Sequence, residues 1–107
     1  MTLHASDMSR LWADSARMAR GNPGRWLSDA LQCIRTTGDG AAAVMLLQKL
    51  RQYANRHEEQ RSIDAVVKWI ERRLHTRPRV TASRLMLELG WLRRMSVIRT
   101  AARRDDG

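Results

Sequence analysis

Residues 41–74 decide the fold; they read AAAVMLLQKLRQYANRHEEQRSIDAVVKWIERRL. No Gly or Pro interrupts residues 55–73, yet the apolar positions form two separate stripes. With each helical residue advancing by about 100°, the second stripe lies nearly opposite the first. A single helix would then be buried on both sides, which a small domain cannot provide. We therefore predict a break near residues 55–62 and an antiparallel hairpin of two helices. The predicted inward-facing residues are Leu46, Leu47, Leu50, Tyr53, Ala54, Ile63, Val66, Val67, Ile70 and Leu74.

Turn signals place two more helices before this hairpin. Residues 7–20 carry apolar side chains at helical spacing and end at Gly21. In the turn that follows, Asn22 can cap a second helix, and Pro23 fits its first position because an N–H is not needed there. Asp39 can cap the third helix in the same way.

The last segment changes its pattern at Gly90. Pro78 disfavours helical geometry at the residue before it, so the fourth helix should end in the loop 75–79. Beyond the loop, the two apolar stripes differ by roughly 110° in direction; they are Leu85, Leu89 and Leu92, and Trp91, Met95, Ile98 and Ala102. We therefore predict a kink or turn at Gly90. The whole chain reads as an all-α fold, a compact bundle of five or six short helices in a single domain of residues 1–107.

Tryptophan dominates the aromatic residues. Trp12, Trp26, Trp69 and Trp91 fall one to each predicted segment, beside one Tyr and no Phe. We interpret each Trp as the anchor of its helix in the core. Stacking on nucleic-acid bases is the alternative use.

Positive charge is concentrated in the C-terminal third of the domain. Residues 72–104 contain ten Arg and one acid, Glu88, whereas the first 71 residues contain ten Lys and Arg and eight Asp and Glu. Such a block predicts a polyanion partner, with nucleic acid first, bound through its phosphates without regard to sequence. An acidic protein surface is one alternative, and a solvated helix face that only keeps the protein soluble is another. The predicted nucleic-acid-binding residues are Arg72, Arg73, Arg77, Arg79, Arg84, Arg93, Arg94, Arg99, Arg103 and Arg104.

Other classes of site find no support in the sequence. The single cysteine, Cys33, excludes an internal disulfide and is typical of a reducing compartment, so we expect a cytoplasmic protein without a signal peptide or membrane span. His4, His57 and His75 stand apart from other potential ligands, so no metal site and no cofactor are predicted. No catalytic motif is present, and we expect no enzymatic activity.

A second interpretation concerns residues 81–104. Residues 80–91, VTASRLMLELGW, resemble the first helix and glycine turn of a helix-turn-helix, which would make the protein a DNA-binding regulator. The pattern departs at Ser96, where such a motif usually has an aliphatic residue, and at Met86, where it favours a small one.

In size, helix content and basic face, the chain resembles the small subunits of CRISPR effector complexes. That resemblance implies a non-catalytic subunit present in several copies within a guide-RNA complex. It would contact other protein subunits and the target or displaced strand without reading sequence. An inhibitor or adaptor that binds an acidic protein is the third interpretation.

Overall fold

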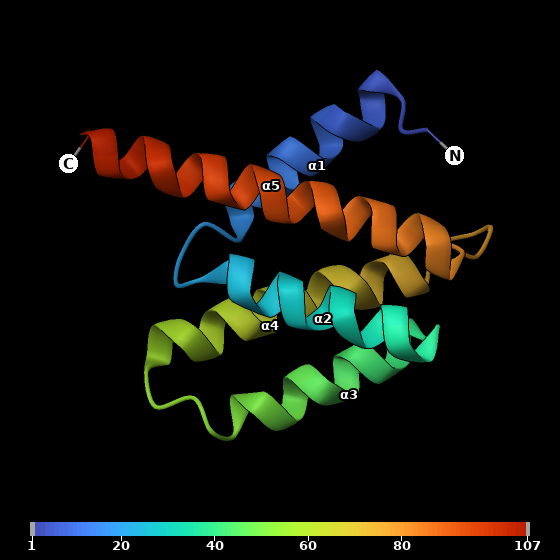
Figure 1. Ribbon diagram of the computed structural model, residues 1–107, viewed down its shortest axis with the longest axis horizontal. Coiled ribbons are helices and arrows are strands. Elements are labelled where there is room, and N and C mark those ends of the chain that lie inside the picture. The colour runs from blue at the N-terminus through green and yellow to red at the C-terminus, as the bar shows by residue number, and fades with distance from the viewer. Residues whose placement is uncertain (1, 107) are drawn as a thin grey trace.

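The computed structural model describes the backbone of residues 2–106 and the side chains of residues 2–102. This part of the chain forms five α-helices and no strand (Figure 1). They are α1 (Ala5–Arg17), α2 (Pro23–Thr37), α3 (Gly40–Arg51), α4 (His57–Leu74) and α5 (Ala82–Asp106). The all-α prediction is confirmed, although α5, with 25 residues, is not short. No helix in the described part of the chain combines the length and apolar character needed to cross a bilayer.

The predicted break between the third and fourth helices is present, but it is shorter than expected. Only residues 52–56 leave the helical conformation, and residues 57–62 form the first turns of α4. Glu58 and Glu59 lie in the first turn of α4, where negative charge is favourable. The Gln60 side chain donates a hydrogen bond to the carbonyl oxygen of Ala54 at 3.0 Å and closes the connection.

The predicted helix starts agree with the structure in two cases. Helix α2 begins with Pro23 at its first position and Asn22 at its N-cap. The Asp39 carboxylate caps α3 by accepting a hydrogen bond from the backbone N–H of Ala41 at 2.9 Å. Helix α1 begins earlier than predicted, at Ala5, and the carboxylate of Asp7 accepts a hydrogen bond from the backbone N–H of His4. Side-chain hydrogen bonds therefore explain the starts of α1 and α3, whereas the Asn22 side chain makes no capping hydrogen bond and the start of α2 depends on the fixed geometry of Pro23.

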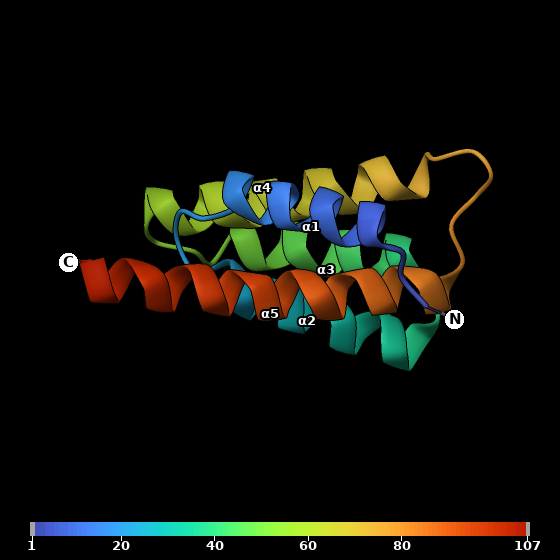
Figure 2. The same cartoon turned by 90° about the horizontal axis from the view of Figure 1, so that it is seen from above.

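Helix α5 runs through Gly90 without interruption, so the predicted turn there is wrong. Figures 1 and 2 show one continuous helix across the molecule. Two polar residues, Glu88 and Ser96, are buried, and they join the separate apolar stripes into one. Ile98 and Ala102, which we expected to face the core, are exposed. The buried stripe of α5 consists of Leu85, Glu88, Leu89, Leu92, Met95 and Ser96.

Helix α2 lies at the centre of the bundle. It packs against α3 on one side and α5 on the other, and α3 and α4 form the hairpin (Figure 1). Helix α1 packs mainly on α5. Figure 2 shows α1 and α4 toward one side of the molecule and α2 and α5 toward the other. Because α1 touches α4 only weakly, their facing surfaces leave room for a groove.

Three of the four tryptophans contribute to the core. Trp26 and Trp69 are buried, Trp91 packs against the core while partly exposed, and Trp12 is 42% exposed. The indole Nε1–H of Trp69 donates a hydrogen bond to the carboxylate of Asp14 at 2.9 Å, which links α4 to α1. Tyr53, which was predicted to face inward, is 80% exposed. The large exposed fraction places it outside the hairpin core.

Gly21 should tolerate substitution less well than Gly38, although both have positive φ, 76° and 70°. A Cβ on Gly21 would lie 2.8 Å from Cβ of Ser62 and 2.9 Å from the carbonyl oxygen of Glu58, whereas nothing lies within 4 Å at Gly38. We expect Gly38→Ala to lower the free energy of unfolding by about 1 kcal/mol, and Gly21→Ala to lower it on the order of 3 kcal/mol. Urea unfolding of both variants measures the difference, and equal losses would contradict the close approach at Gly21.

Candidate nucleic-acid interface

The acid within the arginine-rich segment, Glu88, is fully buried and binds arginines from three helices. Arg73 on α4 donates from Nε to Oε1 and from Nη2 to Oε2, both at 2.8 Å, in a bidentate pair. Arg84 on α5 donates from Nε to Oε2 at 2.8 Å. Nη2 of Arg10 on α1 lies 3.2 Å from Oε1. One carboxylate thus connects α1, α4 and α5.

Asp7 extends this ion cluster at the surface. Its carboxylate lies 3.0 Å from Nη2 of Arg84 and 3.7 Å from Nη2 of Arg10. The backbone N–H of His4 and the guanidinium of Arg84 hold the pKa of Asp7 below its ordinary value. Burial opposes ionisation of Glu88, but the hydrogen bonds from Arg73 and Arg84 outweigh it and lower the pKa of Glu88. Both carboxylates are therefore ionised at neutral pH.

Two of the predicted nucleic-acid-binding residues are members of this cluster. The side chains of Arg73 and Arg84 are only 18% and 23% exposed, and their guanidinium groups bind Glu88. Leaving a buried carboxylate without its partners is strongly unfavourable. These two arginines thus belong to the internal structure and not to an open phosphate-binding face.

Arg99 is also held within the protein. Its guanidinium lies over the Trp12 ring, 3.8 Å from the centroid. Its Nε donates to Oγ of Ser15 at 2.7 Å, and its Nη2 donates to the carbonyl oxygen of Trp12 at 2.8 Å. Arg99 therefore fastens α1 to α5, and the contact combines hydrogen bonds with a cation–π interaction. The expected row of free arginines along α5 is interrupted here.

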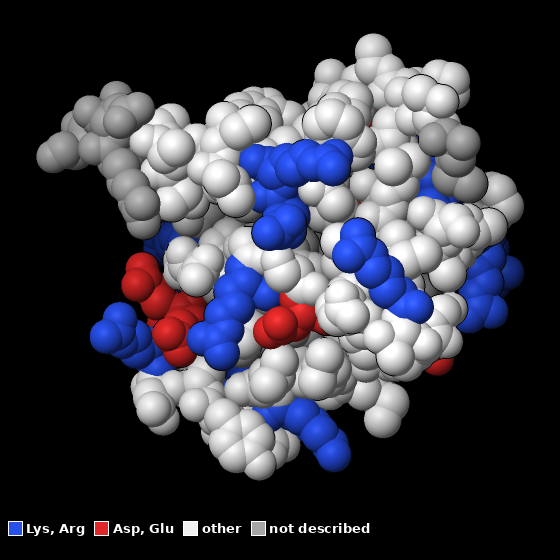
Figure 3. Space-filling model, in the orientation of Figure 1, with Lys and Arg blue, Asp and Glu red and all other residues white. Residues whose placement is uncertain are grey.

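The other predicted residues do not form one continuous patch. The exposed members are Arg72, Arg77, Arg79, Arg93 and Arg94, while the side chains of Arg103 and Arg104 lie outside the described residues. Figure 3 shows one face of the molecule, on which Lys and Arg side chains are separated by uncharged surface and some lie beside acidic ones. Arg94 lies over the Trp91 ring, 4.8 Å from the centroid. On that face the cations stand singly, whereas Arg77 and Arg79 line one hollow at the end of α4.

A groove between α1 and α4 gathers a denser set of cations. Its main cavity has a volume of about 620 Å³. Smaller hollows of about 200 and 220 Å³ adjoin it, because they share the lining residues Arg17, Met18 and Ala65 with it on one side and Asp14 and Arg72 on the other. Lys and Arg residues along this groove are Arg10, Arg17, Arg20, Arg61, Lys68, Arg72 and Arg73.

Most of these cations are available to a ligand. Arg10 and Arg73 bind Glu88, whereas the side chains of Arg17, Arg20, Arg61, Lys68 and Arg72 form no ion pair or hydrogen bond with the described part of the chain. The acidic residues of the groove are Asp14 and Glu71, and Asp14 already accepts the indole hydrogen bond of Trp69. The groove therefore has a net positive lining suited to phosphate groups.

Of this groove, only Arg72 and Arg73 were predicted as binding residues. The α4 part had a readable signal, because Arg61, Ala65, Lys68 and Arg72 recur at spacings of three or four residues and share one helix face. Arg17, at the end of α1, and Arg20, in the turn that follows, had no such signal, since nothing in the sequence says which helix lies beside α4. Among residues 2–102, no three His, Cys, Asp or Glu side chains are placed to hold a metal ion.

Removing the charge of Glu88 should destabilise the protein strongly. In Glu88→Gln, Arg73 and Arg84 remain partly buried without a carboxylate, and we expect the free energy of unfolding to fall by about 3–5 kcal/mol. The control is Asp64→Asn, since Asp64 pairs with Arg51 at 2.8 Å but is 44% exposed. That control should lose less than about 1 kcal/mol. Similar losses in the two variants would show that the cluster contributes no more than a surface pair.

Stability should fall in acid through the same carboxylate. The folded-state pKa of Glu88 lies below its ordinary value of 4.5, so its contribution is complete above pH 4.5 and is lost as the pH falls toward the folded-state pKa. Urea unfolding of wild type and Glu88→Gln across this range measures it. We expect the wild type to lose stability more steeply than the variant below pH 4.5, and parallel curves would show that folding does not lower the pKa of Glu88.

Comparison of the chain with protein-family models, with curated proteins and with solved structures finds no significant match.

Proposed function

We propose that the protein is a non-catalytic, basic helical subunit that binds nucleic acid through its phosphates, without sequence preference, as part of a larger ribonucleoprotein. The groove between α1 and α4 carries the proposal, because five cations there have no partner in the described chain and stand beside two acids. Arginine binds phosphate in a bidentate manner and stacks on bases, and four of the five cations are Arg. A formal net charge of +9 favours the same class of partner.

A place among CRISPR effector small subunits is the specific form of this proposal. Its support is the all-helical fold and the excess of arginine. In that setting the protein would contact the target or displaced strand and neighbouring protein subunits. Exposed apolar side chains away from the groove, Met45 on α3 and Tyr53 in the connection that follows it, are available for contacts with such subunits.

The helix-turn-helix interpretation loses its geometric basis. That motif needs a turn between two helices, but α5 is continuous from Ala82 to Asp106. One of its arginines, Arg84, is bound to Glu88 and Asp7. A duplex-reading helix therefore has no counterpart in α5.

A salt series of binding tests the proposal. We expect the wild type to bind a single-stranded oligonucleotide with an affinity that falls steeply with salt and depends little on sequence. The groove variant Arg61→Glu/Lys68→Glu/Arg72→Glu should lose most of this binding and flatten the log–log slope by about 2, as the loss of three phosphate contacts implies.

The matched control has the same change in net charge on other helices. Arg25→Glu/Arg35→Glu/Lys49→Glu changes exposed residues of α2 and α3 and should keep most of the slope. Absence of binding by the wild type at low salt would refute the proposal. Tight binding to one duplex sequence would instead indicate a DNA-binding regulator.

A further inference from the structure

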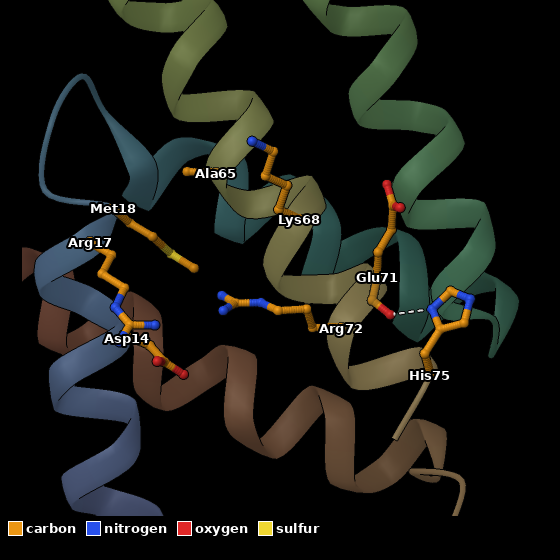
Figure 4. A pocket seen from close by; sticks show the side chains of 8 residues that line it. All are labelled: Asp14, Arg17, Met18, Ala65, Lys68, Glu71, Arg72 and His75. Atoms are coloured by element: carbon orange, nitrogen blue, oxygen red, sulfur yellow. Dashed lines mark hydrogen bonds between the residues drawn. The ribbon is translucent and has the colours of Figure 1, made fainter. Parts of the chain in front are cut away.

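The main cavity of the groove has the size of a small-ligand site. Its volume of about 620 Å³ falls within the range of roughly 300–1,000 Å³ found for such sites. Residues from α1 and α4 line it, as Figure 4 shows. The smaller hollows continue it in both directions along the groove. An extended molecule could therefore enter at one end, place one unit in the cavity and leave at the other.

One part of the cavity wall suits a phosphate. Arg17 and Arg72 line it, and in Figure 4 the Arg72 side chain extends from α4 toward α1, whereas the Lys68 ammonium points away from these two guanidinium groups. The carboxylate of Glu71 points away from α1 in the same view, and the carboxylate of Asp14 is engaged by the indole of Trp69. Guanidinium groups from two helices thus face the cavity with limited competition from the acids.

Another part of the wall suits a flat, apolar ring. Met18 is 3% exposed and its side chain points into the cavity, where Figure 4 shows it opposite Arg72. Ala65 on α4 is small and leaves open space beside it. Thioethers make favourable contacts with aromatic rings, and arginine planes stack on bases. A phosphate wall beside a ring wall is the arrangement that a nucleotide requires.

We propose that this cavity binds one nucleotide, with its phosphate on Arg17 and Arg72 and its base against Met18 and Ala65. The proposal rests on the proposed function where that nucleotide belongs to a strand. A free nucleotide offers the same chemistry, so the test includes both sources. The hollows at either end favour the strand, because they give the neighbouring nucleotides a path.

Methyl spectra of methionine locate the ligand directly. The probes are a single-stranded oligonucleotide and free AMP, each titrated into protein with ¹³C-labelled Met methyl groups. The proposal expects the Met18 signal to shift with the oligonucleotide, and with AMP at higher concentration, while the signal of Met45, exposed on α3, stays in place. A ligand held by charge alone would leave Met18 unmoved, which would overturn the proposal.

A variant with a filled cavity distinguishes the contribution of the base contact to binding from the contribution of charge. Ala65→Phe occupies the space beside Met18 and keeps every cation, and we expect it to weaken oligonucleotide binding by about tenfold, as the loss of one base contact implies. Ala65→Ser leaves the cavity open and should bind as the wild type does. The Met spectra without ligand show whether each variant is folded, and Arg72→Gln, on the exposed part of α4, provides a second test by loss of the phosphate contact.

The outcomes distinguish this proposal from the function above. Salt-sensitive binding that Ala65→Phe and Arg72→Gln leave unchanged would overturn the cavity site while the nucleic-acid function stands. A Met18 shift with AMP but no oligonucleotide binding would support the cavity as a site for a free nucleotide and refute the strand-binding function. Loss of binding in both variants, with Ala65→Ser unaffected, would support both proposals.

Discussion

The buried carboxylate of Glu88 is the interaction on which the arrangement of helices depends. It receives guanidinium groups from α1, α4 and α5, and no other charged residue in the described chain is so deeply buried. Removing two or more charges from water costs free energy. The cluster therefore forms only when the guanidinium groups lie within hydrogen-bond distance of the carboxylate. Because α1 packs mainly on α5, this cluster and the contact of Arg99 with Trp12 fix the position of α1. The width of the groove beside α4 follows from that position.

The fold was predictable where apolar pattern and capping chemistry agree. The opposed stripes around Leu47 and Ile70 gave the hairpin, and Asp39 and Pro23 gave helix starts because their effects are local. The predicted turn at Gly90 was wrong because buried polar residues interrupt the apolar periodicity of α5 without interrupting the helix. Glu88 and Ser96 occupy inward positions, and only their tertiary partners and surroundings make that possible.

The candidate site was less predictable than the fold. Charge density along the sequence pointed to residues 72–104, but it could not show that Arg73, Arg84 and Arg99 would bind within the protein. A high density of arginines along the sequence does not imply a high density of free arginines on the surface. The groove combines cations whose positions differ by about forty residues or more, such as Arg17 and Arg61, and that combination exists only once α1 has been placed on α5.

The buried carboxylate of Glu88 also fixes the position of α5 along its own axis. Leu85, Leu89 and Leu92 are alike, so apolar packing alone would tolerate a slide of α5 by one turn with little change in buried surface. A slide of that size would carry Glu88 away from Arg73 and Arg10 and leave its charge unpaired. Glu88 thus specifies the register of α5 against α1 and α4, as a single polar residue in the core of a coiled coil specifies the register of its helices. The Glu88 ion cluster therefore selects one alignment of α5 in the bundle, in addition to any stability that it contributes.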